Sequence, residues 1–344
     1  LMRSSAASDV YKRQVNQCQF TDLLLGGPYG GYIADANSGF NTGKFSTYDP
    51  QSNWSPVFYR VIYTNEMSNF TELCKVTEDE NAIAVAKVVK VAGVHRVADT
   101  YGPIPYTQVG TGADPVPLDS EKEVFKAMFA DLDAAVEVLT RNRAGMITTD
   151  ADRLYGGSLE RWGRLANSLK LRLAMRARFA APGDAQTWAE EAVNFQFGAY
   201  NIGVMTDNTH SAQLLTRTGI GFSYKHPLEY LWGEYNECRM GATMESYLSG
   251  YGDPRLESYF SPAEKDGAYH GIPNGIISNP KDYQSLASCP KVGFTSPLTW
   301  MCAAEVCFLR AEGALLGWNM GGTAENLYNE GCLLYTSPSP RDCS

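Results

Sequence analysis

One segment, residues 158–179 (SLERWGRLANSLKLRLAMRARF), constrains the fold more than any other part of the chain. Its apolar residues recur at steps of three and four, which places them along one face of an α-helix, and Ser158 stands where an N-cap belongs. The segment carries six Lys and Arg residues but a single carboxylate, Glu160. Like charges four residues apart, such as Arg172 and Arg176, repel each other. We therefore expect one face of this helix to be core and the other to need acidic neighbours.

The counter-charges for this basic helix are expected from within the protein. The chain carries a net charge of −9, which argues against a general binder of nucleic acid or anionic membranes. A helical pattern beginning at Asp119 has an acidic face made of Asp119, Glu121, Glu123, Asp131, Asp133 and Glu137. Pairing with this acidic helix is the favoured interpretation, and the alternatives are a solvated basic face and a local nucleic-acid groove.

The two ends of the chain differ in pattern from the sequence between them. Residues 1–14 and 333–344 resemble translated adaptor sequence, and two disordered termini are the alternative. Residues 15–332 are predicted to form a single domain that is truncated at both ends. With 344 residues and a hydrophobic content of 44%, the chain is long enough to bury a large core.

Apolar periodicity predicts further helices, separated by loops rich in Gly, Asn, Ser and Pro. The expected helices cover residues 54–73, 81–99, 119–139, 184–195, 299–318 and 323–330, and the expected long loops cover 26–53, 198–223 and 267–294. Ser120 and Glu123 have the spacing of a capping box. The last two helices would form a helix-turn-helix pair of the kind that is stacked in tetratricopeptide-like repeats.

Several short segments, in this order along the chain, resemble the SusD/RagB family of surface lipoproteins that capture nutrients for Gram-negative bacteria. The likeness extends over about residues 15–332. The segments that carry it are the start of the helix at Trp54–Asn65, DTYGPIPY at Asp99–Tyr106, the acidic helix from Asp119, Arg161-Trp162 with NSLKLR at Asn167–Arg172, DPRL at Asp253–Leu256 with Tyr259-Phe260, and RAEGA at Arg310–Ala314 with LYNEG at Leu327–Gly331.

This resemblance implies a mostly α-helical fold, in which tetratricopeptide-like helix pairs support a loop-rich ligand-binding region with few short strands. It also implies a non-catalytic protein that binds oligosaccharides or polysaccharides, or in some cases peptides, on the cell surface. The implied partner is a SusC-like TonB-dependent transporter. Attachment to the outer membrane would use an N-terminal lipid anchor, which this sequence lacks, as it lacks a C-terminal continuation after Gly331.

Aromatic and amide side chains in the loops are the candidate ligand contacts, because sugars present flat C–H faces to aromatic rings and hydroxyls to polar groups. The first loop region offers Tyr29, Tyr32, Asn37, Tyr48 and Trp54, and the second offers Tyr224, Tyr230, Trp232, Tyr235, Tyr269 and Asn274. Core packing is the alternative for each, above all for Trp232 and Tyr235, which flank a helix. Trp162, Trp188 and Trp318 are predicted to lie within helices and to be structural.

Two other function classes stay open at this point. A carbohydrate-active hydrolase would need a pair of carboxylates across the sugar, and Glu229, Glu234, Glu237 and Asp253 are candidates without a pattern that selects among them. A helical-repeat adaptor that binds only proteins is the second alternative. The spacing of the cysteines and histidines matches no zinc motif, so no metal, cofactor or disulfide framework is expected.

Overall fold

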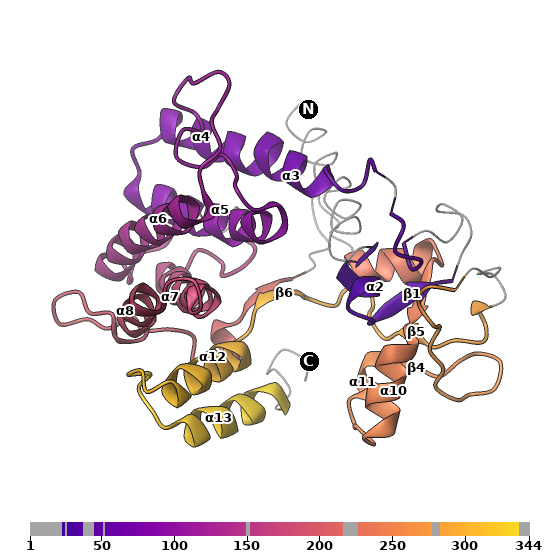
Figure 1. The fold of residues 1–344 in the computed structure, drawn as a ribbon. Coiled ribbons are helices and arrows are strands. Elements are labelled where there is room, and N and C mark those ends of the chain that lie inside the picture. The colour runs from indigo at the N-terminus through magenta and orange to yellow at the C-terminus, as the bar shows by residue number, and fades with distance from the viewer. Residues whose placement is uncertain are drawn as a thin grey trace. The chain divides into compact units, whose positions relative to one another are not determined.

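A computed structural model describes residues 23–24, 26–36, 45–50, 52–148, 152–215, 226–276 and 283–336. Its contacts divide the chain into two compact units (Figure 1). We call residues 62–214 with 299–344 the helical unit, and residues 1–61 with 215–298 the loop-rich unit. The structure is mostly helical with few short strands, which confirms the expected fold class. The prediction of adaptor-derived ends around one domain at 15–332 stays a prediction.

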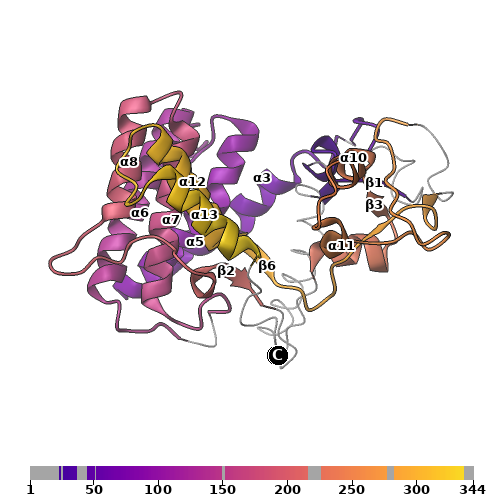
Figure 2. The ribbon, with the colours of Figure 1, turned by 90° about the horizontal axis from the view of Figure 1, so that it is seen from below.

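The helical unit contains three pairs of helices that are consecutive in the chain. The pairs are α5 (Glu80–Tyr101) with α6 (Glu121–Arg141), α7 (Leu159–Ala177) with α8 (Pro182–Asn194), and α12 (Ala303–Leu315) with α13 (Ala324–Thr336). Helix α7 packs against α5, α6, α8 and α12, so the basic helix lies at the centre of this unit (Figure 2). These pairs are the tetratricopeptide-like element that the sequence predicts.

Local sequence signals start these helices. Ser120 and Glu123 form the predicted capping box, in which each side chain bonds to the backbone of the other residue. The hydroxyl of Ser158 accepts from the backbone N–H of Arg161 at the start of α7. Thr323 does the same for the N–H of Asn326 at the start of α13. Side-chain caps satisfy backbone donors that a helix leaves unpaired at its first turn.

The predicted helix at 54–73 is interrupted by a π-helical turn. It consists of α3 (Val57–Val61), η3 (Ile62–Met67) and α4 (Ser68–Val76). The π turn places the carboxyl of Glu66 against Gly93 of α5, so closely that a methyl group on Gly93 would collide with the carboxylate oxygens. Burial raises the pKa of Glu66 to about 8, against the attraction of Lys90. The absence of a side chain at Gly93 therefore makes room for a buried acid.

Lys90 is a buried cation in the core of the same unit. Its ammonium lies 2.5 Å from a carboxylate oxygen of Asp131 and over the rings of Phe70 and Tyr106, at 4.3 and 4.6 Å from their centroids. The hydroxyl of Tyr106 donates to Asp131 at 2.7 Å. The DTYGPIPY segment thus contributes its last tyrosine to a closed polar cluster in the core.

The charged side chains of the basic helix α7 are paired within the protein, as predicted. Most of their partners, however, do not lie on the acidic helix α6. Arg172 makes a two-pronged contact with Glu305 of α12, with both N–O distances at 2.7 Å. Of the acidic helix α6, only Asp133 bonds to α7, through Lys170, among the contacts of the described residues. The other pairs are Arg164 with Glu160, Arg176 with Asp99 and Arg178 with Glu312. The prediction of α6 as the main partner was wrong because α7 has several neighbours. In addition, Asp131 of α6 pairs with Lys87 and Lys90 of α5.

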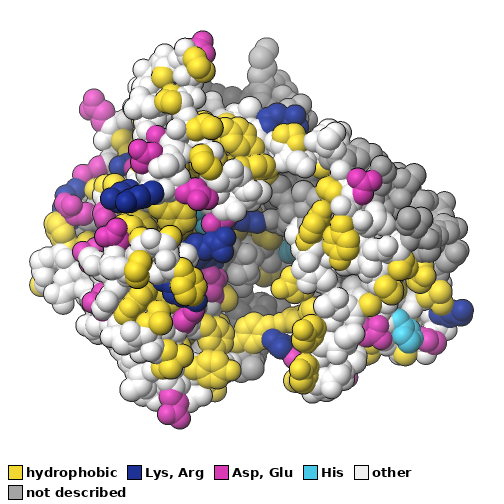
Figure 3. Space-filling view, viewed as in Figure 1, with side chains coloured by type: hydrophobic (Ala, Val, Ile, Leu, Met, Phe, Trp, Pro, Cys, Tyr) yellow, Lys and Arg dark blue, Asp and Glu magenta, His cyan; other side chains and the backbone are white. Residues whose placement is uncertain are grey.

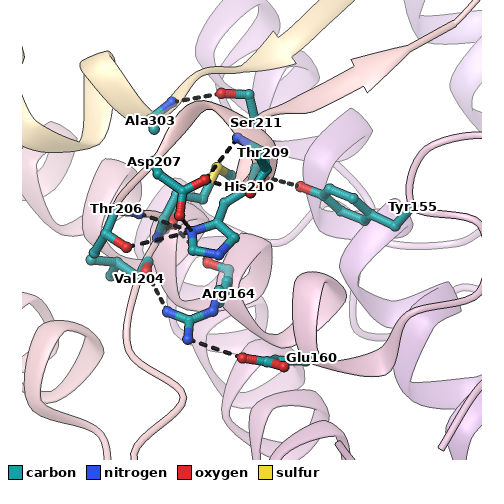
Figure 4. Close-up of polar contacts among 12 residues, drawn as sticks. Tyr155, Glu160, Arg164, Val204, Thr206, Asp207, Thr209, His210, Ser211 and Ala303 are labelled. Carbon is teal, nitrogen blue, oxygen red and sulfur yellow. Dashed lines mark hydrogen bonds and ion pairs between the residues drawn. The ribbon is translucent and has the colours of Figure 1, made fainter. Parts of the chain in front are cut away.

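Residues 204–210, which we call the crossing segment, are held against α7 by polar side chains (Figure 4). Arg164 donates to the carbonyl of Val204 at 3.2 Å, and the N–H of Met205 donates to the hydroxyl of Ser168 at 3.0 Å. Further along, Tyr155 donates to the carbonyl of His210, which lies in the short 3₁₀ helix η4 (Asn208–His210). Arg164 and Ser168 of α7, together with Tyr155, therefore hold the crossing segment in place.

The crossing segment continues into a two-stranded sheet of β2 (Ala212–Leu214) and β6 (Leu298–Met301). The predicted helix at 299–318 is wrong in its first residues, because Thr299 and Trp300 are in this strand and α12 begins at Ala303. The hydroxyl of Ser211 accepts from the backbone N–H of Ala303 at 3.0 Å. Strand pairing therefore outweighs the helical pattern of the sequence at this point.

The loop-rich unit is built from short elements around small cores. Its elements are α2 (Gly27–Tyr29), β1 (Ile33–Asp35), α9 (Pro227–Glu229), η5 (Tyr230–Glu234), β3 (Cys238–Met240), α10 (Ala242–Gly250), α11 (Leu256–Tyr259), β4 (Phe260–Ser261) and β5 (Cys289–Pro290). Strands β1 and β3 pair antiparallel, with Ile33 opposite Met240. β4 pairs with β5 in the same sense. The predicted loop at 26–53 therefore contains a helical turn and a strand, because β3, distant in sequence, supplies the partner for β1.

Candidate ligand-binding site

Three tyrosines of the first loop region are exposed on the loop-rich unit. Tyr29 ends α2, Tyr32 precedes β1, and Tyr48 lies in the turn at 45–48. The rings of Tyr29 and Tyr48 meet edge to face, with centroids 5.1 Å apart and planes at 74°. We call Tyr29, Tyr32 and Tyr48 the tyrosine cluster. On the face seen in Figure 3, apolar and aromatic side chains reach the surface of this unit, at the right of the view.

Backbone contacts between distant segments hold this cluster in place. The side-chain amide of Asn274 donates to the carbonyl of Pro28 at 2.8 Å, and the N–H of Gly275 donates to the carbonyl of Ser46 at 2.6 Å. Residues 274–275 therefore tie the α2 turn to the turn of Tyr48. The carbonyl oxygen of the Asn274 side chain is buried and has no hydrogen-bond partner among the described residues.

Tyr48 has a backbone conformation that is unusual for a residue with a side chain. Its φ is +61°, in the left-handed region that favours glycine. Its side chain is nevertheless 48% exposed, so packing of the ring does not explain the strain. Strained residues of this kind are frequent at ligand sites.

Gly30 makes room for the ring of Tyr32, whereas Gly275 is favoured by its own backbone conformation. A methyl group at Gly30 would lie 2.6 Å from the ring of Tyr32, so the absence of a side chain lets that ring fold back over the turn. At Gly275, where φ is +84°, a methyl group would approach the ring of Tyr48 to 3.8 Å. Exposed aromatic rings with apolar faces are a type of surface that binds sugars.

The structure corrects the expectation for Trp54. This side chain is only 4% exposed and belongs to a core cluster with Leu24, Ile33, Phe45, Leu231 and Cys238. A ring enclosed in this way has no face for a ligand. The sequence could not show this, because the residues that cover Trp54 come from both halves of the loop-rich unit.

The second group of candidates is only partly available at the surface. Trp232 is half-buried against the same core, and its indole N–H donates to the carbonyl of Val292 at 3.0 Å. Tyr230 and Tyr235 contact edge to face at 5.0 Å, and Tyr235 is exposed. Tyr269 is half-buried against the Met240 core cluster. Their role in ligand binding stays a prediction, and Asn37 and Tyr224 lie outside the described residues.

The carboxylates considered for hydrolysis have structural surroundings. Glu229 and Glu237 are buried, and burial with the nearby charge of Asp35 raises the pKa of Glu237 to about 8. Hydrogen bonds from Arg255 hold the pKa of Asp253 down at about 2. Asp253 and Arg255 also link the end of α10 to the start of α11. The DPRL segment therefore forms a turn that is braced by its own ion pair.

Two exposed tyrosines that the sequence pattern did not single out are Tyr247 of α10 and Tyr251, which directly follows this helix. Their rings lie 6.2 Å apart with planes at 20°. The available signal was their spacing of four residues, which puts two aromatic rings on one helix face.

Metal and membrane sites were sought over the described ranges. No group of three or more His, Cys, Asp or Glu side chains there is arranged to hold a metal ion. Among the helices that the structure describes, none combines the length and apolar character needed to cross a bilayer.

Comparisons with known proteins place the chain in a family. The family model for SusD-like proteins, described as SusD and RagB outer membrane lipoproteins, matches residues 3–337. A search of the curated proteins finds no match.

Solved structures of SusD homologues share the fold. A chitin-binding SusD homologue from Flavobacterium johnsoniae is 36% identical, with a TM-score of 0.83 over 92% of this chain and 65% of its own. A SusD homologue from Bacteroides uniformis is 35% identical, with a TM-score of 0.80 over 96% and 70%. One from Bacteroides ovatus is 32% identical, with a TM-score of 0.84 over 97% and 70%. This chain thus spans about two thirds of the length of these relatives, and it belongs to the SusD/RagB family of outer-membrane lipoproteins.

Proposed function

We propose that this protein binds neutral glycans at the cell surface without cleaving them. The observation that carries the proposal is the tyrosine cluster, in which three exposed rings lie on turns of the loop-rich unit and two of them are in contact. Support comes from the Flavobacterium johnsoniae relative, which binds chitin. Chitin oligosaccharides are therefore the first ligands to test.

The chemistry of the cluster suits sugar rings. Tyrosine offers a flat apolar face for the C–H groups of a pyranose and a hydroxyl for its edge, and it has few rotatable bonds to immobilise. Asn274 contributes indirectly, because its side-chain amide donates to the carbonyl of Pro28 and ties down the turn that carries Tyr29. The tyrosines and Asn274 carry no charge, so an uncharged glycan fits them better than an acidic one.

The proposed partner is a SusC-like TonB-dependent transporter, to which the protein would deliver its glycan. This part of the proposal rests on membership of the family. Co-purification with a co-expressed SusC-like transporter would support it. Glycan binding without any such association would contradict it.

Binding is favoured over hydrolysis by the state of the carboxylates. Glu229 and Glu237 are buried and Asp253 is bound to Arg255, whereas the exposed aromatic rings lie in the tyrosine cluster. A hydrolase would release new reducing ends from a polysaccharide panel. An adaptor that binds only proteins would bind the transporter and no glycan.

The proposal is tested by calorimetry with chitohexaose and the full chain. Tyr48→Ala should weaken binding by about tenfold or more, which corresponds to about 1.4 kcal/mol, because one ring face is lost. The matched control is Tyr200→Ala in the helical unit. Tyr200 is 47% exposed, close to the 48% of Tyr48, but its ring is covered by the guanidinium of Arg143 at 3.4 Å.

Three results would overturn the proposal. They are equal binding by both variants, no binding to any glycan of a broad panel, and release of reducing ends by the purified wild-type protein. The last result would favour the hydrolase.

A further inference from the structure

Helix α10 presents a stripe of exposed side chains that the proposed site does not use. Thr243 and Tyr247 lie on α10, and Tyr251 directly follows its last residue. The three are exposed and follow one another at intervals of four residues, which places them along one side of the helix and its end. On another side, Met244 and Leu248 pack into the core cluster of Met240 and Phe260. The packing of α10 therefore does not account for the two tyrosines.

The rings of Tyr247 and Tyr251 are exposed and are stacked with nearly parallel planes. Their planes differ by only 20°, with centroids 6.2 Å apart, and the residues are 62% and 81% exposed. The pairs Tyr29–Tyr48 and Tyr230–Tyr235, in contrast, meet at 74° and 84°. In a stacked pair the inner faces are turned towards each other, and the high exposure of both residues shows that the rest of each ring is open to a ligand.

The stripe starts at the tyrosine cluster. A methyl group at Gly31, between Tyr29 and Tyr32, would lie 2.7 Å from the Cβ atom of Thr243. The N–H of Gly241 donates to the carbonyl of Tyr32 at 3.0 Å. The first turn of α10 is thus fixed directly to the turn that carries two tyrosines of the cluster.

The length of the stripe follows from helix geometry. Eight residues separate Thr243 from Tyr251, which corresponds to about 12 Å at about 1.5 Å per residue. This is longer than one sugar ring, so a ligand that spans it must be a chain of sugars.

The stripe is uncharged. Glu245 is the one charged residue in the sequence of α10, ATMESYLSG. Its carboxylate accepts from the backbone N–H of Gly271 at 2.7 Å and lies 4.0 Å from the imidazole of His270. The exposed neighbours on the helix include Ser246 and Ser249, whose hydroxyls are neutral. The stripe therefore suits a neutral chain better than an acidic polysaccharide.

We infer that Tyr247 and Tyr251 extend the glycan site along α10 and stack against the distal sugars of a linear, uncharged polysaccharide chain. The inference rests on the proposed function, and it adds selection for chain length. Short oligosaccharides occupy the tyrosine cluster alone. Longer chains continue over Thr243 and contact both rings of the stripe.

The test is calorimetry of the full chain with chitobiose, chitotetraose and chitohexaose. Wild-type affinity should rise with chain length. The double variant Tyr247→Ala/Tyr251→Ala should bind chitobiose as the wild type does and lose about tenfold in affinity for chitohexaose, because stacking on the stripe is removed. Tyr247→Phe/Tyr251→Phe should retain the gain with length, because the ring faces remain.

The matched control is Tyr328→Ala/Tyr335→Ala on α13 of the helical unit, where both tyrosines are also exposed. This variant should bind all three oligosaccharides like the wild type. A double α10 variant that binds chitohexaose as tightly as the wild type, with a native circular dichroism spectrum, would overturn the inference but leave the proposed function standing. A wild type that binds no glycan would overturn the proposed function itself.

Discussion

Aromatic side chains serve different purposes in the two units. In the helical unit, Trp162 is buried and donates its indole N–H to Asp152 at 2.8 Å, and Trp188 stacks on Phe129 at 3.9 Å. In the loop-rich unit, Trp54 is buried, but the tyrosine cluster faces solvent. A protein gains stability from burying rings, so exposed ring pairs without a packing role indicate a use outside the fold.

Buried charges of the helical unit are closed into pairs, such as Lys170 with Asp133 and Lys90 with Asp131. Buried side-chain atoms without a partner among the described residues occur in both units, such as the oxygen of Asn167 in the helical unit and the oxygen of Asn274 in the loop-rich unit. The contrast between the units therefore lies in their aromatic side chains.

The largest expected effect tests the internal use of polar groups in the helical unit. Asp152 accepts from the backbone N–H groups of Leu154, Tyr155 and Gly157 and from the indole of Trp162. Asp152→Ala leaves four donors without this acceptor, so we expect it to lower the free energy of unfolding by about 3–5 kcal/mol. Urea unfolding followed by tryptophan fluorescence measures this. A loss below about 1 kcal/mol would contradict this expectation, because the buried hydrogen bonds of Asp152 would then contribute little to the stability of the helical unit.

A second prediction concerns pH, since each unit buries one carboxyl whose pKa is about 8, Glu66 and Glu237. Each is protonated in the folded protein up to that pH but ionises near 4.5 once unfolded. The contribution of each protonated carboxyl to the free energy of unfolding is therefore fully present below about pH 4.5. It is lost as the pH rises towards 8, at up to about 1.4 kcal/mol per pH unit for each group. Urea midpoints from pH 5 to pH 8 measure the slope.

Glu66→Gln and Glu237→Gln should each remove part of this slope, because glutamine does not ionise. Glu72→Gln is the control, since Glu72 is exposed and pairs only with Lys75 among the described contacts. A wild-type protein whose stability does not change over this range would contradict the burial of both acids.

A smaller effect of opposite sign is expected at the tyrosine cluster. Tyr48→Gly relieves a left-handed backbone conformation, so it should raise the free energy of unfolding by about 1 kcal/mol. The same change should weaken glycan binding, because the ring is lost. Unfolding and calorimetry on one sample measure both. A destabilised Tyr48→Gly variant would show that the ring supports the fold, which would remove the contrast between the units.

The smallest effect is expected at an exposed ion pair of the basic helix. Arg176 bonds to Asp99 at 2.9 Å, but its side chain is largely exposed. Arg176→Ala should change the free energy of unfolding by about 0.5 kcal/mol or less, because water screens such pairs. Arg172→Ala is the comparison, since its two-pronged bond to Glu305 is more enclosed and should cost more. Equal losses in urea unfolding would contradict this ranking.

Local patterns predicted much of the helical unit. The capping box at Ser120 and Glu123 and the periodic apolar face of 158–179 depend on residues within a few positions of one another, and both are present in the structure. Predictions failed where a distant segment decided the outcome. Strand β6 formed at Thr299 and Trp300 because β2 lies beside it. Arg172 bonded to Glu305, which is far along the chain, and not to the acidic helix.

The sequence by itself determined the family, the helix pairs and the self-paired basic helix, because these follow from periodicity, caps and charge balance along the chain. Tertiary structure alone decided which rings are available to a ligand. Trp54 and Tyr48 come from the same loop region, yet one is enclosed by Leu231 and Cys238 and the other is held open beside Asn274. The physical reason is that burial depends on what packs against a side chain, and those neighbours lie nearly two hundred residues away.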